Sequence, residues 1–215
     1  MSNMQIIINK ALDYVKVKFE NEFSGHDYFH TERVYKTAMR IAESEGAELE
    51  VVALAALLHD VDDRKISLAT SEGLDNARTF LEDNGKSDEE ICRILTVIRE
   101  ISFSANETAP TTIEGKCVQD ADRLDAIGAI GIARAFAYGG SRGRLMHHPK
   151  AMPNLDMTRE EYAKSESTTV NHFFEKLFKL KGMMNTATAI EIANERDGYM
   201  RRFIDEFMAE WDGKR

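Results

Sequence analysis

Apolar residues recur along most of this chain at intervals of three and four positions, which places them on one face of an α-helix. Glycine and proline interrupt the pattern and divide it into successive helices. None of the segments alternates apolar and polar residues as a half-buried β-strand does. The sequence therefore predicts an all-α fold. Helices are expected over residues 3–22, 27–45, 51–58, 71–84, 87 onward, 112–138, 158–180 and 185–211.

Two of the expected helices are apolar on most sides, which is typical of a buried helix rather than a surface one. Residues 51–58 carry only apolar side chains and run directly into His59. Residues 112–138 form a longer segment that is mostly apolar in its second half, and Gly128 and Gly131 within it are expected to allow close helix packing. We expect both segments to be central helices of the fold.

Ionisable residues occupy positions where this pattern predicts burial. His30 lies one helical turn before Val34 on an apolar face, His59 and Asp60 close the apolar segment, and Asp122 shares a face with apolar neighbours. Each alone is also explained as a hydrogen-bonded core residue. A buried carboxylate is costly, however, unless it is paired, hydrogen-bonded or bound to a metal. Two imidazoles and two carboxylates could satisfy one another through a divalent cation.

The composition narrows the class of protein. The chain has 215 residues, of which 43% are hydrophobic, enough for one continuous core, so a single domain over residues 1–215 is expected. Its formal charge of -9 opposes the broad basic surface of nucleic-acid-binding proteins. The two cysteines form no CxxC pair, which favours reduced thiols and a cytoplasmic location. No signal peptide or membrane span is expected.

Three peptides in order along the chain carry a family resemblance. They are GHDYFHTERV, LLHDVDDRK and VQDADRLDAIGAIG. Together they resemble the H...HD...D signature of the HD-domain superfamily of metal-dependent phosphohydrolases, and are most similar to small bacterial stand-alone HD hydrolases. The resemblance covers a core of about residues 25–135 and implies a helical bundle with additional C-terminal helices. It also implies four metal ligands, hereafter the four predicted ligands: His30, His59, Asp60 and Asp122.

The resemblance also bears on the cofactor. Some HD proteins bind a second metal through extra histidines between the doublet and the distal aspartate, and none lies between His59 and Asp122 here. This favours one divalent metal ion and argues against a two-metal cyclic-dinucleotide phosphodiesterase. Mixed nitrogen and oxygen ligands suit Mn, Fe, Co, Ni or Zn, and Mg is left open. The family implies an open coordination position where water is activated to attack phosphorus.

Two further residues near the motifs are candidates for catalysis. Asp63 comes four residues after His59 and three after Asp60, so a helix continuing through this point would place it on the same face, where it could orient or deprotonate water. The alternative is a solvated carboxylate at a helix end. Arg33, one turn from His30, could bind phosphate oxygens, or it could pair with an acidic neighbour.

Residues 139–157 are rich in glycine and proline and predict a loop, which is followed by C-terminal helices within residues 158–211. The loop concentrates positive charge in an otherwise acidic chain, and three of its residues are candidates for contacting an anionic substrate: Arg142, Arg144 and His147. A basic connector is also commonly just a solvated surface.

The resemblance implies a hydrolase acting on a nucleotide or similar small phosphorylated metabolite. The splitting of a nucleoside triphosphate into monophosphate and pyrophosphate is one reaction that it leaves open. One alternative is a guanosine alarmone hydrolase, although those relatives have a Glu-Asp pair where this chain has Asp63-Arg64. Another alternative is a non-catalytic binding or regulatory module, in which the metal only holds the helices together. The expected partner is a small anionic substrate, with no nucleic acid and no membrane, and the sequence leaves a homodimer open.

Overall fold

The computed structural model describes residues 2–20, 27–63, 67–101, 109–156 and 167–215. These residues are mainly helical and contain no β-strand, so the all-α prediction is confirmed. They group into two compact units. The first comprises Met1–Asp122 with Asn185–Ala189, and the second comprises Arg123–Met184 with Ile190–Arg215. The expectation of one domain over residues 1–215 stays a prediction. No described helix is long and apolar enough to cross a membrane.

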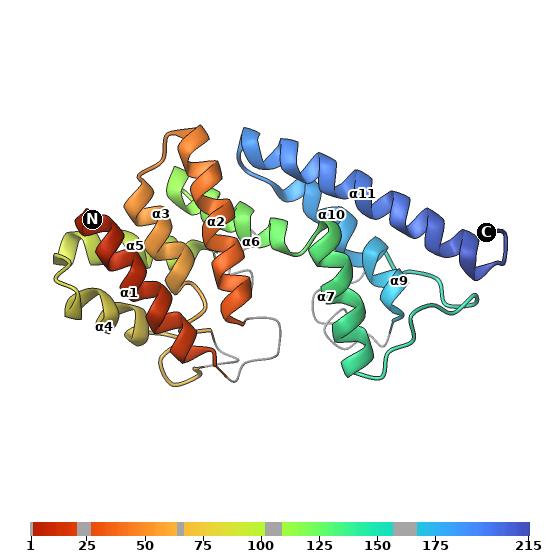
Figure 1. The fold of residues 1–215 in the computed structure, drawn as a ribbon, viewed down its shortest axis with the longest axis horizontal. Helices are drawn as coiled ribbons and strands as arrows, with labels where there is room; N and C mark the ends of the chain where they lie inside the picture. Colours follow the sequence, from red (N-terminus) through yellow and green to blue (C-terminus); the bar gives the residue numbers. More distant parts are fainter. Residues whose placement is uncertain (1, 21–26, 64–66, 102–108, 157–166) are drawn as a thin grey trace. The chain divides into compact units, whose positions relative to one another are not determined.

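The first unit is arranged around one buried helix (Figure 1). Its helices are α1 (Asn3–Lys18), α2 (Tyr28–Glu45), α3 (Leu49–Leu58), α4 (Asp75–Asp83), α5 (Asp88–Ile101) and the part of α6 (Ile113–Asp125) that ends at Asp122. Helix α3 contacts α1, α2 and α5, and α4 contacts α5. Every residue from Val51 to Leu58 is buried, as the apolar segment predicts, because a helix covered on several sides has no face for polar side chains.

Local capping residues fix several helix ends in this unit. The Asp27 side chain accepts a hydrogen bond from the backbone N–H of His30 at 2.7 Å, which starts α2. Gly46, with φ 71°, ends it in a left-handed conformation. At α5, the backbone N–H of Ser87 donates to the Glu90 carboxylate at 2.8 Å and the backbone N–H of Glu90 donates to Oγ of Ser87 at 3.4 Å, which together form a capping box.

Two helices of this unit are shorter than their patterns predict. Helix α1 ends at Lys18 rather than at residue 22, and residues 21–22 lie outside the described residues. Helix α4 begins at Asp75 rather than at residue 71, because the chain passes through turns up to Leu74, which has a positive φ of 56°. A non-glycine residue in this region cannot belong to a regular right-handed helix.

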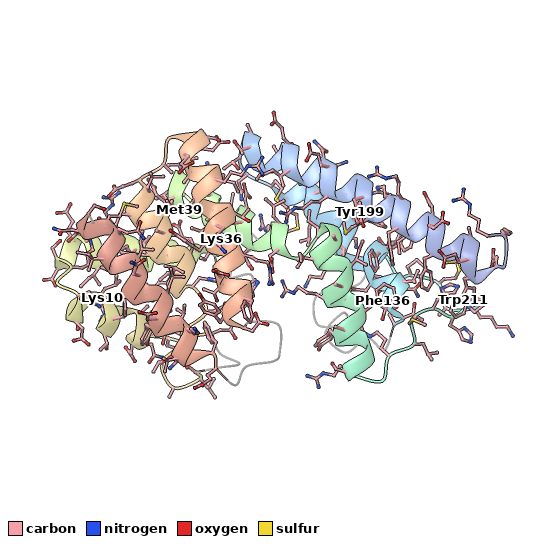
Figure 2. The ribbon with its side chains drawn as sticks, viewed as in Figure 1. Lys10, Lys36, Met39, Phe136, Tyr199 and Trp211 are labelled. Atoms are coloured by element: carbon pink, nitrogen blue, oxygen red, sulfur yellow. The ribbon has the colours of Figure 1, made fainter. Side chains whose placement is uncertain are left out.

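The second unit contains the C-terminal helices. They are α7 (Gly128–Ser141), α9 (Thr169–His172), the π-helix η1 (Phe173–Leu177), α10 (Phe178–Leu180), the 3₁₀-helix η2 (Lys181–Met183) and α11 (Ala187–Trp211) from Ile190 onward. A row of aromatic rings, partly exposed, joins α7 to α11. Phe136 of α7 lies 5.8 Å from Phe203 and from Phe207 of α11 between ring centroids, and Trp211 stacks on Phe207 at 5.9 Å (Figure 2).

The prediction of a single helix over residues 112–138 is wrong, because the segment forms two helices, α6 and α7. The break is made at Gly128, whose φ of +77° favours glycine, and a Cβ there would lie 2.9 Å from Cγ of Arg196. At Gly131, a Cβ would lie 2.3 Å from the backbone oxygen of Ala126. Gly128 therefore begins a helix instead of lying inside one, and Gly131 permits α7 to pack against the preceding turn.

The boundaries of the predicted loop also change. Helix α7 continues through Gly139 and Gly140 to Ser141, so the loop begins at Arg142 rather than at residue 139. The helix expected from residue 158 begins at Thr169 in the described part of the chain, and residues 157–166 lie outside it. Glycine is therefore a poor guide to the end of α7, because its low helix propensity is a weak preference that packing overrides.

Candidate metal centre

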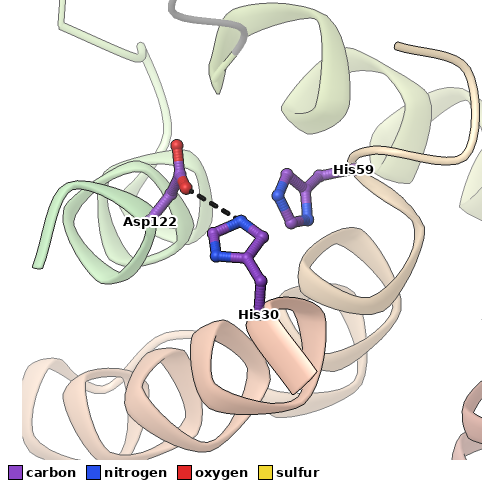
Figure 3. A group of neighbouring side chains, drawn as sticks. All are labelled: His30, His59 and Asp122. Carbon is purple, nitrogen blue, oxygen red and sulfur yellow. Dashed lines mark ion pairs between the residues drawn. The ribbon is translucent and has the colours of Figure 1, made fainter. Parts of the chain in front are cut away.

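The first unit brings together side chains from three separate parts of the sequence (Figure 3). His30 lies in the first turn of α2, His59 directly follows α3, and Asp122 lies on α6. One nitrogen or oxygen atom from each lies within 4.8 Å of the other two, which is a spacing that can hold a metal ion. Figure 3 shows the two imidazole rings and the carboxylate pointing toward one another.

Asp60 completes the cluster. Its Oδ2 lies 3.2 Å from Nε2 of His59 and 3.6 Å from Nε2 of His30. Nε2 of His30 also lies 3.3 Å from Oδ1 of Asp122. The structure therefore brings all four predicted ligands together, two through nitrogen and two through oxygen, and their role as metal ligands is taken up as a proposal below.

Backbone contacts orient the two histidines. The bond from the His30 N–H to Asp27 caps α2 and so fixes the backbone from which the His30 ring extends. In His59, Nδ1 lies 2.8 Å from the backbone oxygen of Ala56, to which the protonated nitrogen donates. This tautomer leaves the lone pair of Nε2 facing the cluster, which is the arrangement that metal-binding histidines adopt.

Burial and charge make the cluster suited to a cation. The His30 side chain is 2% exposed, and Nε2 of His59 is buried without a hydrogen bond among the described residues. Burial alone would lower the pKa of His59, but the carboxylates of Asp60 and Asp122 outweigh it and raise that pKa to about 9. The same two negative charges that raise this pKa favour a divalent cation beside Nε2.

The same contacts act on Asp122. Burial would raise the pKa of its carboxyl group, but the hydrogen bond and charge of His30, with the charge of His59, hold the pKa below its ordinary value. The Asp122 side chain is 32% exposed, against 9% for that of Asp60. Asp122 is therefore an ionised ligand candidate on the more open side of the cluster.

The other aspartates of α6 have different partners. Asp120 is fully buried, and its carboxylate accepts hydrogen bonds from the backbone N–H groups of Asn185 at 2.9 Å and Thr186 at 2.8 Å. Asp125 belongs to the second unit and pairs with Arg134 at 2.5 Å. These bonds connect Asp120 and Asp125 to neighbouring parts of their own units.

The helical register expected for Asp63 is wrong. Helix α3 ends at Leu58, and the next residues form turns in which the backbone N–H of Val61 bonds Leu58 and that of Asp63 bonds Asp60. Asp63 is half-buried, and its catalytic role stays a prediction. Arg33 is half-buried on α2, one turn beyond His30, and its predicted role in binding phosphate also stays a prediction.

The predicted substrate residues of the basic loop lie in the second unit. The Arg142 guanidinium lies 5.5 Å from the ring centroid of Tyr138, and the ring of His147 packs edge-on against Trp211 at 5.1 Å. His147 thus has a packing role. Substrate contact by Arg142, Arg144 and His147 stays a prediction.

One buried carboxylate near the cluster has no signal in the local sequence. Asp62, next to Asp63 in the chain, is 3% exposed and accepts hydrogen bonds from the backbone N–H groups of Asn76 and Ala77. Its partners lie more than a dozen residues away, beyond the reach of helical periodicity or capping patterns.

The family profile described as HD domain matches residues 27–127, which contain all four predicted ligands. YpgQ of Bacillus subtilis is 40% identical over 198 residues, which cover 89% of this chain and 87% of YpgQ. The chain belongs to the HD domain family.

Solved structures of relatives share its fold over nearly the whole length. A crystal structure from Lactobacillus plantarum has a TM-score of 0.82, with 40% identity and 99% of each chain covered. An HD-superfamily hydrolase from Bacillus thuringiensis has a TM-score of 0.79, with 42% identity, 97% of this chain and 98% of that chain. Bacillus subtilis YpgQ in complex with ADP has a TM-score of 0.76, with 35% identity in this comparison and 97% of each chain covered.

Proposed function

We propose that this protein is a metal-dependent phosphohydrolase acting on a nucleotide or a similar small phosphorylated metabolite. The observation that carries the proposal is the convergence of two imidazole nitrogens and two carboxylates in one buried cluster. Water bound to a metal in such a site is more acidic, and the metal's charge favours phosphate oxygens. The related HD-superfamily hydrolase of Bacillus thuringiensis supports hydrolysis as the class of reaction.

The donor set supports one divalent ion. His30 and His59 would hold it through Nε2, and Asp60 and Asp122 through their carboxylates. Nitrogen with oxygen donors suits Mn, Fe, Co, Ni or Zn better than Mg, which prefers oxygen and keeps its waters. Because Asp122 is the more exposed carboxylate, the substrate phosphate would approach from its side.

The other predicted residues serve the phosphate and the water in this proposal. Asp63 accepts the proton of the attacking water, and Arg33 binds a phosphate oxygen, as guanidinium groups do. Arg142, Arg144 and His147 bind the remaining negative charge of the substrate. Their positive charge sets the loop apart from a chain whose formal net charge is -9.

A nucleotide is the substrate class that the relatives favour. YpgQ was crystallised in complex with ADP, and its structure covers 97% of this chain. If the substrate is a nucleoside triphosphate, the water oxygen bonds to the α-phosphorus and the bond from that phosphorus to the bridging oxygen breaks. The products are then a nucleoside monophosphate, which keeps the water oxygen, and pyrophosphate.

The test combines metal analysis with a product screen. The purified protein is stripped with chelator, loaded separately with Mn²⁺, Co²⁺, Ni²⁺, Zn²⁺ or Mg²⁺, and incubated with nucleoside mono-, di- and triphosphates. We expect metal-dependent release of pyrophosphate from triphosphates. Release of orthophosphate from monophosphates would instead identify a phosphomonoesterase. Tight metal binding without turnover of any nucleotide would contradict the proposal and favour the binding module.

A further inference from the structure

The turn that follows the His59-Asp60 pair is held by one buried side chain, that of Asp62. Its Oδ1 accepts hydrogen bonds from the backbone N–H of Asn76 at 3.1 Å and from Nδ2 of Asn76 at 2.7 Å. Its Oδ2 accepts a hydrogen bond from the backbone N–H of Ala77 at 2.9 Å. Asp62 is only 3% exposed, so these bonds are shielded from competition by water.

The bonds from Asn76 and Ala77 satisfy the start of α4. These are the second and third residues of that helix, and the N–H groups of a first helical turn have no partner within the helix. The preceding residue, Leu74, makes no side-chain capping bond. Asp62 therefore performs from a distant position the function that a capping residue usually performs locally, and its negative charge suits the positive end of the helix.

The Asn76 side chain makes a second connection between α4 and the turn that follows His59 and Asp60. Its Nδ2 lies 3.2 Å from the backbone oxygen of Val61 and 2.8 Å from Oγ1 of Thr70, in addition to its contact with Asp62. On the other side, the turn is joined to α3 through the bond from the Val61 N–H to the Leu58 oxygen at 3.3 Å. The short segment that carries His59 and Asp60 is thus fixed at both ends.

We propose that Asp62 is a positioning residue of the metal centre. By anchoring the turn to the start of α4, it holds His59 and Asp60 where they meet His30 and Asp122. The inference rests on the proposed metal site and adds to it a residue that does not touch the metal. Groups that orient metal ligands through hydrogen bonds typically change metal affinity by 10-fold to 100-fold when they are removed.

The variant Asp62→Asn tests this role, because it keeps the shape of the side chain but replaces one acceptor oxygen with an NH₂ group. In place of Oδ2 that group faces the backbone N–H of Ala77 and one anchoring bond is lost, and in place of Oδ1 it faces two donors of Asn76 and two bonds are lost. We expect the Kd for Co²⁺, measured by calorimetry, to rise roughly 10-fold to 100-fold. The visible absorption of the bound Co²⁺ should also change, because it reports ligand geometry, which a loss of stability alone would not alter.

Two further variants separate positioning from stability. Arg78→Gly weakens α4 at an exposed position that has no bond to Asp62, and should lower the melting temperature by roughly 2–4 °C without changing the Kd for Co²⁺. Asn76→Ala removes the Nδ2 contacts with Asp62, Val61 and Thr70 but keeps the two backbone bonds to Asp62, and should raise the Kd by a smaller factor. This variant decides the question if Asp62→Asn does not fold.

The outcomes are distinguishable. Wild-type affinity and an unchanged Co²⁺ spectrum in both Asp62→Asn and Asn76→Ala would overturn the positioning role and leave the metal centre intact. An equal rise in Kd in Arg78→Gly would also overturn it, because helix stability would then explain the effect. A wild-type protein that binds none of the divalent metals would instead overturn the proposed metal site on which the inference rests.

Discussion

The imidazole of His59 shows how one backbone contact prepares a side chain for metal. The Ala56 backbone oxygen accepts a hydrogen bond from Nδ1–H, and Nε2 is left facing the carboxylates of Asp60 and Asp122. We expect His59→Ala and Asp122→Ala each to abolish metal binding and hydrolysis, because each removes one of four ligands. Elemental analysis after dialysis measures the bound metal.

A histidine outside the cluster provides the control for these variants. His148→Ala changes an exposed residue of the second unit and should retain the metal content of the wild type. Stoichiometric metal in either His59→Ala or Asp122→Ala would remove that residue from the ligand set.

Asp63→Asn tests the proposed proton acceptor without changing the size of the side chain. If Asp63 accepts the proton of the attacking water, kcat should fall by roughly 10²-fold to 10⁴-fold, while metal content and melting temperature stay at wild-type values. Steady-state kinetics on the metal-loaded protein measure the effect. A loss of metal would make Asp63 a ligand, and an unchanged kcat would identify it as a solvated carboxylate.

His172 of α9 makes the stability of the protein depend on pH. Burial, with a smaller effect of the positive charges of Lys176 and Arg144, lowers its pKa from 6.5 to about 4. Between these values the unfolded chain binds a proton that the folded chain does not. The contribution is therefore complete above pH 6.5 and is lost as pH falls toward 4.

Denaturant unfolding at pH 7 and pH 4.5 measures this contribution. We expect the wild type to lose on the order of 1–2 kcal/mol more free energy of unfolding than His172→Gln over this interval. An equal loss in both proteins would mean that the acid sensitivity comes from other groups.

The meeting of the four predicted ligands could be anticipated from the sequence, because the family resemblance links their peptides and the apolar patterns beside them indicate burial. Asp62 could not, because its burial depends on backbone groups of Asn76 and Ala77 that only the folded chain brings near. The apolar run stops at Leu58, as α3 does, and the register expected for Asp63 is wrong because it continued the helix past that end.

At the scale of helices, the elements with local caps were predicted well. Helix α2 begins after Asp27 and ends at Gly46, and the Ser87-Glu90 box precedes α5. The sequence did not predict the break between α6 and α7. Gly128 lies in a segment with helical periodicity, and only the structure shows its left-handed conformation. Local signals thus predicted the elements whose ends are determined by neighbouring residues, and not those whose ends are determined by tertiary contacts.

Two glycines of α7 provide a matched pair of variants. Gly131→Ala should lower the free energy of unfolding by about 1–3 kcal/mol, since its Cβ would lie 2.3 Å from the Ala126 backbone oxygen and the helix start must shift. Gly140→Ala has no atom within 4 Å of its Cβ and should raise stability by up to about 1 kcal/mol. Denaturant unfolding compares them, and an equal effect of both would contradict the packing argument.

At the scale of the whole molecule, all four predicted ligands belong to the first unit. A metal that binds only the folded cluster therefore stabilises that unit. With free Mn²⁺ at 100 times its Kd, the expected gain is about 2.7 kcal/mol, and EDTA should remove it. Calorimetric scans with and without EDTA measure the shift in melting temperature. A scan that is insensitive to EDTA, for a protein shown to contain metal, would contradict this linkage.

The first unit is discontinuous in sequence, and this has a consequence for how the chain is made. Asn185 and Thr186 belong to it and hold the fully buried carboxylate of Asp120. The ribosome must therefore translate the second-unit segment Arg123–Met184 before Asp120 can form its hydrogen bonds with Asn185 and Thr186. A gene fragment that stops at Met184 would encode an unsatisfied buried acid two residues from the proposed ligand Asp122, so the unit that holds the proposed metal site cannot be excised simply by shortening the gene.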